Sequence, residues 1–377
     1  MWCRAGWERA RRKPSTRGAW PRPSGRLHKL HGCRTWIHPF LNDRSREGKA
    51  LLRNIPQPPG RDKATLVEPA GHGILAATAV AALGKRRRGK RVNREAEENK
   101  KNRRRSRVSR RAFLLGGGAA GGLVLADALV REPRAFQVQE VVLPLAKVPP
   151  GRELRLVHLS DLHIRSFHGY FEKVARTVNG LEPDLILLTG DYLEQRRNLD
   201  GVQRFVSMLK APGGIFAVQG NWEYWARLEG ENLRRHFARW GATLLINRSH
   251  DLDLHGVPLS VLGLDYPSPS DRVKLLARMA APERVNLLLS HVPAFDHQAL
   301  EGRIDLILCG HTHGGQVRLP FVPPFYLPRF SEPFIEGLYR VGPEETPLYV
   351  TRGVGTSILP VRFLCRPEIT LLRLHAA

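Results

Sequence analysis

Two histidines one residue apart, His311 and His313, are the residues in this sequence best suited to chemistry. They lie in a glycine-rich segment, 310–315, directly after an apolar run, 304–309, that has the length of a short buried strand. In an irregular loop, imidazoles at this spacing can serve two adjacent metal ions. On a regular strand they would share a face but stand well apart. A surface pair or a helix-capping pair shows the same local pattern, so the pair alone leaves its chemistry open.

Each of four further apolar runs is followed directly by residues that can bind metals. The runs cover 154–159, 184–189, 215–218 and 285–289, and the residues that follow them are Asp161 and His163, then Asp191, Asn221 and His291. Glycine precedes Asp191, Asn221 and His311, so the backbone can turn sharply into a crowded site. One carboxylate alone would fit a buried hydrogen-bonded acid, and one His a packed core residue. Seven donors at five strand ends favour a metal site, because ligands of α/β proteins bind beyond the carboxyl ends of strands.

The apolar segments predict the elements that must position these residues. The predicted strands are 138–143, 154–159, 184–189, 215–218, 243–246, 259–264, 285–289 and 305–308, and the predicted helices are 171–181, 231–240 and 271–279. Ser270 or Asp271 is expected to cap the last helix. Residues 334–374 alternate as strands with Pro and Gly turns. Strands separated by helices indicate an α/β fold of stacked sheets flanked by helices.

The positive charge of the chain is confined to its first third. Of the 377 residues, 1–111 contain 31 Lys and Arg against 8 Asp and Glu, whereas 112–377 contain 29 against 27. The folded part is therefore nearly neutral, which argues against nucleic acid as its partner. The four cysteines are too few and too scattered for a disulfide framework or a CxxC zinc site. Cys309 lies in an apolar run and is expected to be a small core residue.

Residues 1–100 do not have the pattern of a folded domain, since Trp, Arg, Pro, Gly and His recur there without a period. The apolar run 73–83 is too short to span a bilayer. Two interpretations remain open. The segment is a disordered basic tail, or Met1 is not the true start and translation begins near Val92 at a codon other than Met. No methionine follows Met1 before Met208.

Residues 101–130 resemble a twin-arginine export signal. Ser109, Arg110 and Arg111 lead into Phe-Leu and a glycine-rich apolar run, and 126–128 offers a small-x-small cleavage site. A basic nuclear-type or phosphate-binding run is the alternative. Export would involve the twin-arginine machinery and would place the protein in the periplasm or on the outer face of the cytoplasmic membrane. A globular domain is expected over 136–377.

The order D-x-H, G-D, G-N, H, G-H-x-H over 154–374 resembles the calcineurin-like metallophosphoesterase family. The resemblance implies a four-layer α-β-β-α sandwich of the metallo-dependent phosphatase type and a site with two metals. One metal would be held by Asp161, His163, Asp191 and His313, and the other by Asp191, Asn221, His291 and His311, with Asp191 bridging. Asp191, Asn221 and His311 would also be catalytic. Mixed N and O donors suit Mn, Fe, Zn or Co better than Ca, and two such ions would bind a phosphate ester and activate a water.

One position departs from the family pattern. The family has G-N-H-[DE], in which the His helps to protonate the leaving group, and this sequence has Trp222 there, followed by Glu223. Indole is not an acid at neutral pH, and general acid help contributes typically about 10²–10⁴-fold. Unless Glu223 or His168 takes this role, the substitution favours a diphosphate or an activated diester, whose leaving group needs little help.

Segments 310–320, 352–356 and 359–363 resemble a membrane-associated subgroup of this family. It includes twin-arginine-exported phosphodiesterases and enzymes that cleave UDP-2,3-diacylglucosamine, although a cytoplasmic substrate conflicts with export. The loop 319–327 is interpreted either as packing on the core or as an apolar lip for an acyl chain or a bilayer. Arg318 and Arg352 are candidate phosphate ligands or ordinary surface residues. The sequence thus predicts an exported binuclear hydrolase of a phosphodiester or pyrophosphate. A nuclease and a metal-bound protein without catalysis are its rivals.

Overall fold

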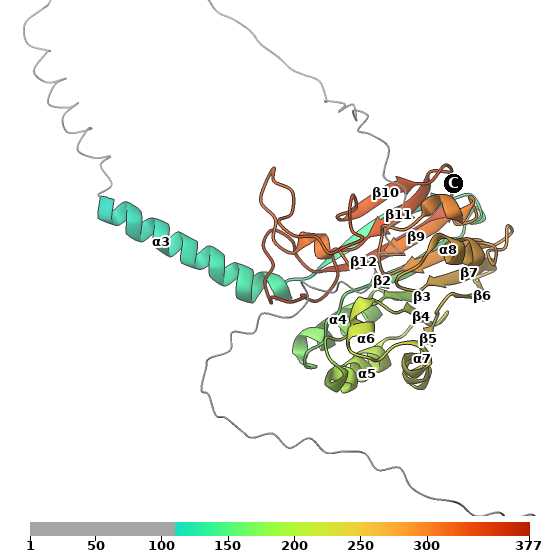
Figure 1. Ribbon diagram of the computed structural model, residues 1–377, viewed down its shortest axis with the longest axis horizontal. Helices are drawn as coiled ribbons and strands as arrows, with labels where there is room; N and C mark the ends of the chain where they lie inside the picture. Colours follow the sequence, from blue (N-terminus) through green and yellow to red (C-terminus); the bar gives the residue numbers. More distant parts are fainter. Residues whose placement is uncertain (1–109) are drawn as a thin grey trace, which may run out of the picture. The chain divides into compact units, whose positions relative to one another are not determined.

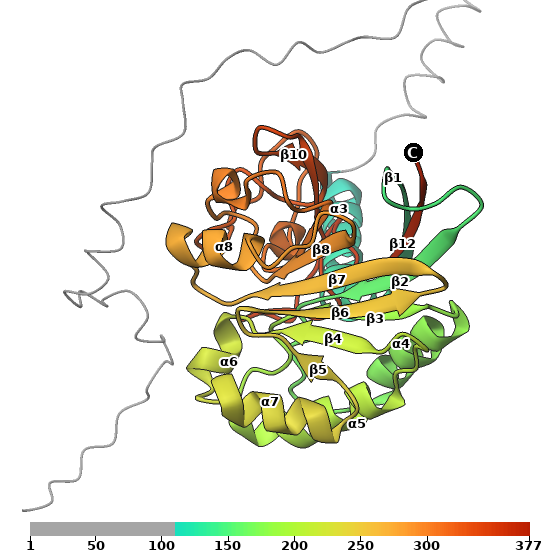
Figure 2. The ribbon, with the colours of Figure 1, turned by 90° about the vertical axis from the view of Figure 1, so that its right-hand side faces the viewer.

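The computed structural model describes residues 110–377, and the predicted leader 1–100 lies outside these residues. Two six-stranded sheets lie face to face, and helices cover both outer faces (Figure 2). The chain therefore has the four-layer α-β-β-α sandwich that was predicted.

The first sheet contains the strands that lead to Asp161, Asp191 and Asn221. Its order is β1 (Gln137–Leu145), β12 (Glu368–Ala376), β2 (Glu153–Leu159), β3 (Leu185–Thr189), β4 (Ile215–Val218) and β5 (Thr243–Leu244). Strands β2 to β5 are parallel, whereas β12 runs antiparallel to β2. Its outer face is covered by α4 (Gly169–Gly180), α5 (Leu199–Met208) and α7 (Gly230–Arg239) (Figures 1 and 2).

The second sheet contains the strands that lead to His291 and His311. Its order is β10 (Gly337–Val341), β11 (Thr346–Val350), β9 (Leu306–Cys309), β8 (Val285–Ser290), β7 (Val257–Leu264) and β6 (Arg248–Leu254). Strands β7, β8, β9 and β11 are parallel. Helix α8 (Ser270–Ala277) packs on its outer face, where Cys309 is a fully buried core residue as expected.

Side chains that alternate between the two faces of each strand form the core layers of the sandwich. In β2, Leu154 and Leu156 point into the core between the sheets, while Val157 and Leu159 pack under the helices. Successive side chains of a strand point to opposite faces, so a strand that is apolar throughout is buried on both. The parallel strands at the centre of both sheets consequently bring their carboxyl ends to one edge of the sandwich.

Three elements and one cap differ from the sequence prediction. Helix α5, the short helix α6 (Asn221–Trp225) and strand β6 were not predicted. Strand β6 is largely exposed and polar, so its pairing with β7 rather than its own pattern makes it a strand. The predicted cap of α8 was wrong, because Pro269 is the cap residue, without a side-chain bond, and Ser270 begins the helix.

Helix α3 (Arg110–Ala126) precedes the sandwich and continues into helical turns over Asp127–Arg131 and Glu132–Arg134. Between residues 110 and 377, no helix has both the length and the apolar character needed to cross a bilayer. Ala128 is buried, its carbonyl accepts from the Arg362 N–H, and the Glu132 carboxylate accepts from the Cys365 N–H. Contacts with the domain thus begin before the expected start at 136.

Candidate metal centre

All seven predicted donors lie beyond the carboxyl ends of five strands, and all are buried. Asp161 and His163 follow β2, Asp191 follows β3, Asn221 follows β4, His291 follows β8, and His311 and His313 follow β9. The first three of these strands belong to one sheet and the last two to the other. Both sheets must therefore be in place before the site exists.

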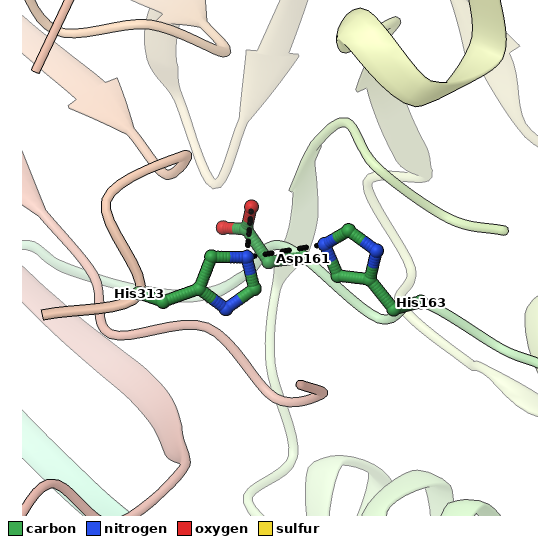
Figure 3. A group of neighbouring side chains, drawn as sticks. All are labelled: Asp161, His163 and His313. Carbon is green, nitrogen blue, oxygen red and sulfur yellow. Dashed lines mark hydrogen bonds and ion pairs between the residues drawn. The ribbon is translucent and has the colours of Figure 1, made fainter. Parts of the chain in front are cut away.

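Asp161, His163 and His313 form the first group (Figure 3). The Nε2 atom of His313 lies 3.4 Å from Oδ1 of Asp161 and 3.1 Å from Nε2 of His163. One ligand atom from each residue lies within 4.8 Å of the others. The Nδ1 atoms of both histidines are buried without a hydrogen-bond partner in the described part of the chain.

Asp191, His291 and His311 form the second group, and Asn221 joins it. The Nε2 atom of His291 lies 3.1 Å from Nδ1 of His311, 3.2 Å from Oδ2 of Asp191 and 3.0 Å from Oδ1 of Asn221. The same Asp191 oxygen lies 3.6 Å from Nε2 of His163 in the first group. Asp191 is thus the residue placed between the two groups.

The ring orientations test whether this second group fits a metal. The Thr189 carbonyl lies 2.7 Å from Nδ1 of His291, and the Arg329 carbonyl lies 2.8 Å from Nε2 of His311. A carbonyl only accepts, so each of these ring nitrogens must donate its proton. In the neutral rings, the other two nitrogens then face each other as lone pairs, with the oxygens of Asp191 and Asn221 beside them. Because a divalent cation satisfies all four atoms at once and a single proton does not, the group fits a metal.

The protonation states of two histidines also suit metal binding, and the carboxylates hold a positive charge on a third. Burial lowers the pKa of both His163 and His311 to about 4, so their rings are neutral at pH 7. Burial alone would raise the pKa of Asp191, but His291 outweighs it and brings that pKa to about 2. Conversely, burial opposes the charge of His291, while Asp191 and Asp161 raise its pKa to about 9. Without a metal, the His291 ring therefore carries the positive charge that the carboxylates attract at pH 7. A cation bound there would take the place of that proton, and the ring would then be neutral.

Two divalent cations held by these groups would supply positive charge to phosphoryl oxygens and would lower the pKa of a bound water. The protein's own contribution is to hold the donors rigidly in place. Five donors have left-handed backbone conformations, with φ of 54° at Asp161, 44° at His163, 56° at Asp191, 73° at His311 and 52° at His313. Such conformations of non-glycine residues cost roughly 1–3 kcal/mol each and concentrate at functional sites.

The glycines before the donors serve two different purposes. Gly190 has φ of 90°, so it makes the sharp turn that was predicted. Gly220 and Gly310 do not have positive φ, and their role is close approach. A Cβ on Gly220 would lie 2.2 Å from Oδ1 of Asp191, and one on Gly310 would lie 1.9 Å from Oγ of Ser160.

Glu223 holds two of the donor loops together, a role that sequence reasoning missed. Its Oε2 accepts the backbone N–H groups of Gly220 at 2.7 Å and Asp191 at 3.0 Å, and its Oε1 accepts that of Tyr192 at 2.8 Å. Burial raises its pKa to about 7. With both oxygens committed to backbone donors, Glu223 positions Asp191 and Asn221 and does not act as the substitute acid.

Trp222 lines the first group. Its backbone N–H donates to Oδ1 of Asp191 at 3.0 Å, and its indole meets His163 edge-on, with ring centroids 5.4 Å apart. His168 instead caps α4, where its ring accepts the Tyr170 N–H. This capping position does not support His168 as the missing acid.

Three arginines around the site have protein partners. Arg318 is paired with Glu336, and Arg352 with Glu368 at 2.7 Å, so the structure gives no support to their predicted binding of phosphate. Arg362 is fully buried and donates to the carbonyl of Gly355, among others. The loop that it stabilises packs on the backbone of Asp161 and Leu162. The motif 359–363 contains Arg362, but its sequence does not indicate this supporting role.

Known proteins share this sequence pattern. Residues 154–315 match the family model described as calcineurin-like phosphoesterase. The chain is 30% identical over 267 residues to the uncharacterized metallophosphoesterase YkuE of Bacillus subtilis, covering 68% of this chain and 91% of that protein. It is 32% identical over 236 residues to the phosphodiesterase YaeI of Escherichia coli, covering 58% and 82%. It is 32% identical over 268 residues to a transmembrane protein with metallophosphoesterase domain of Danio rerio, covering 66% and 60%.

The match to YkuE extends over nearly all of that protein, and the matched family region contains both buried donor groups. The resemblance seen in the sequence is therefore confirmed at the level of the family. This chain belongs to the calcineurin-like phosphoesterase family, and it is a metal-dependent phosphoester hydrolase that uses two divalent metals.

Proposed function

We propose that this enzyme hydrolyses a phosphodiester or pyrophosphate bond whose leaving group departs without being protonated. The observation that carries this proposal is Trp222, which stands beside His163 where the family motif has a His. Glu223, the acid next to it, is occupied by three backbone donors. A good leaving group, such as a phosphate or a nitrophenolate, removes the need for the missing acid.

We propose the seven donors as the metal ligands, with Asp191 bridging the two metals. Asp191, Asn221 and His311 are also proposed as catalytic residues. Turnover of bis-p-nitrophenyl phosphate by the Mn²⁺-loaded full chain, and its loss after chelation, tests the proposal. We expect the nitrophenyl diester and a nucleoside diphosphate ester to be cleaved faster than simple alkyl phosphate esters. A metal-bound protein without catalysis would turn over none of them, and a nuclease would prefer DNA or RNA.

A second candidate is a lipid-linked substrate such as UDP-2,3-diacylglucosamine. It is supported by the loop 319–327, in which Phe321, Phe325 and Tyr326 are exposed. The loop itself rests on Gly315 through Pro324, as the packing interpretation expects, whereas these three side chains are exposed and fit an apolar lip. Hydrolysis of this substrate in detergent micelles, compared with free UDP-sugars, tests the acyl preference.

We also propose export by the twin-arginine route to the periplasm or the outer face of the cytoplasmic membrane. The support is the order of residues 103–130, with paired arginines, Phe-Leu and an apolar helix whose Leu114, Leu115 and Leu123 are exposed. An exported enzyme would meet a phosphoester lipid of the outer leaflet rather than a cytoplasmic UDP-lipid.

Replacement of both Arg110 and Arg111 by Lys should strand the protein in the cytoplasm, because the export receptor reads the arginine pair and not its charge. Cell fractionation with an activity assay measures the distribution. Replacement of Arg204, an exposed residue of α5, by Lys serves as the control and should leave export unchanged. Normal export of the double variant would contradict the proposed signal.

A further inference from the structure

We infer that two apolar loops beside the metal centre form a docking face for an anionic lipid bilayer. We define the docking face as Leu319, Phe321, Val322, Phe325, Tyr326, Ile358, Leu359 and Leu364. The inference deepens the proposed action on a lipid-linked phosphoester and rests on it for its purpose. The evidence for it is separate from the evidence for that substrate. It consists of the exposed apolar side chains of the two loops, the hydrogen bonds between the loops, and the arginines around them.

The side chains of the docking face are large, apolar and exposed. The exposed fraction is 106% for Phe321, 69% for Phe325, 64% for both Tyr326 and Ile358, and 62% for Leu359. Single exposed apolar residues are ordinary on soluble proteins, but a contiguous group of them marks a surface that meets a partner or a membrane. Aromatic rings are favoured where one side of the partner is hydrocarbon and the other is water.

The two loops form one surface because they are bonded to each other. Val317 and Phe363 form a parallel bridge, and the Arg318 N–H donates to the Phe363 carbonyl at 2.9 Å. The Gln316 side chain pairs with the backbone of Ser357, donating at 3.1 Å and accepting at 2.7 Å. In Figure 1 the loops are the orange and red segments that project from the left-hand end of the sheets.

The docking face is also tied to the metal centre. A Cβ on Gly315, which follows the last donor loop, would lie 2.4 Å from the Pro324 side chain. Loop 319–327 therefore rests directly on the segment that carries His313. Its prolines have fixed φ and no N–H group, so the loop is stiff and brings few backbone donors into an apolar phase.

The positive charge around the docking face favours an anionic bilayer as its occupant. The segments 316–330 and 357–366 contain four arginines and no Asp or Glu. Arg318 is paired with Glu336 and Arg362 is buried, but Arg329 and Arg366 are exposed at the rim. Exposed apolar residues with a basic rim are typical of interfacial membrane binding.

The surface continues into the chain that precedes the domain. The Ala128 carbonyl accepts the N–H of Arg362 in the second loop, and the neighbouring Leu129 and Val130 are 46% and 57% exposed. The apolar helix α3 and the basic run 103–111 come just before them in the sequence. A bilayer fits this continuity better than a second copy of the chain, because the loops and the residues bonded to them from the preceding segment all expose apolar side chains.

Co-sedimentation of the full chain with vesicles of phosphatidylcholine and phosphatidylglycerol tests the inference. We expect the double variant Phe321→Ser/Phe325→Ser to lower the partition coefficient on the order of tenfold. The variant Ile358→Ser/Leu359→Ser should do the same from the second loop. The control Leu275→Ser/Leu338→Ser removes exposed apolar residues from α8 and β10 and should change binding less than about twofold.

Hydrolysis of soluble bis-p-nitrophenyl phosphate separates this inference from the proposed function. If all variants retain it, the fold and the metal centre are intact and only docking is measured. Vesicle binding that is unchanged in both loop variants would overturn the docking face, and so would a dimer of the native chain that only the loop variants convert to monomer. If the native protein does not hydrolyse the diester at all, the proposed function is refuted, but the vesicle result remains valid.

Discussion

Replacement of Asp191 by Asn should remove most of the metal and most of the activity. The carboxylate lies between the two donor groups, with its Oδ2 3.2 Å from Nε2 of His291 and 3.6 Å from Nε2 of His163. Asn keeps the shape and the oxygen that accepts the Trp222 N–H, but it lacks the charge that both cations need. We expect kcat/KM for a nitrophenyl diester to fall at least about a thousandfold, which corresponds to about 4 kcal/mol of transition-state stabilisation.

Elemental analysis of purified protein distinguishes a loss at both sites from a loss at one. The Asp191→Asn variant should hold less metal at both sites, whereas His313→Ala should affect mainly the first group. The exposed Asp200 on α5 provides the control, since Asp200→Asn removes the same charge away from the site. A content of about two metals per chain in the Asp191→Asn protein would refute the assignment of Asp191 as the bridging residue.

The second large effect concerns the leaving group. Since Trp222 replaces the expected acid, the rate should fall steeply as the pKa of the leaving group rises. Diphosphates and nitrophenyl esters should be cleaved well, and simple alkyl phosphates poorly. Replacement of Trp222 by His should raise the rate for alkyl esters by up to about 10²–10⁴-fold, and the rate for nitrophenyl esters much less. The new imidazole would stand beside His163, at the edge of the first group.

The measurement is kcat/KM for both proteins over a series of esters with graded leaving-group pKa. Replacement of Trp225, which is exposed and packs against Trp222, by His is the matched control and should leave the slope unchanged. A flat dependence in the native enzyme would mean that another acid acts, and the preference for diphosphates would lose its main support.

The sequence by itself determined the family and the fold class, and it predicted the set of donors. Each donor directly follows an apolar strand, as Asp161 follows β2 and His291 follows β8. Such local patterns are readable because a strand buried on both faces must be apolar throughout, and a metal ligand must stand where the strand stops. The core position of Cys309 was predictable for the same reason.

The tertiary structure decided how the donors meet and what supports them. The sequence does not say that Asp191 lies between the histidines of two sheets, or that carbonyls of Thr189 and Arg329 orient the rings of His291 and His311. It suggested Glu223 as an acid, but three backbone N–H groups from two loops make it a positioning residue. These features depend on contacts between segments far apart in the chain, which no local pattern records.

The loop 319–327 also shows what the sequence determines and what only the tertiary structure decides. Proline and aromatic residues in 319–327 fit a packed loop and an exposed lip equally well, because composition does not tell which side of a loop faces the core. Packing of Pro324 on Gly315 and the bridge from Val317 to Phe363 turn the aromatic side chains outward. The sequence determined that these residues are apolar, and only the fold decided that they are exposed beside the metal centre.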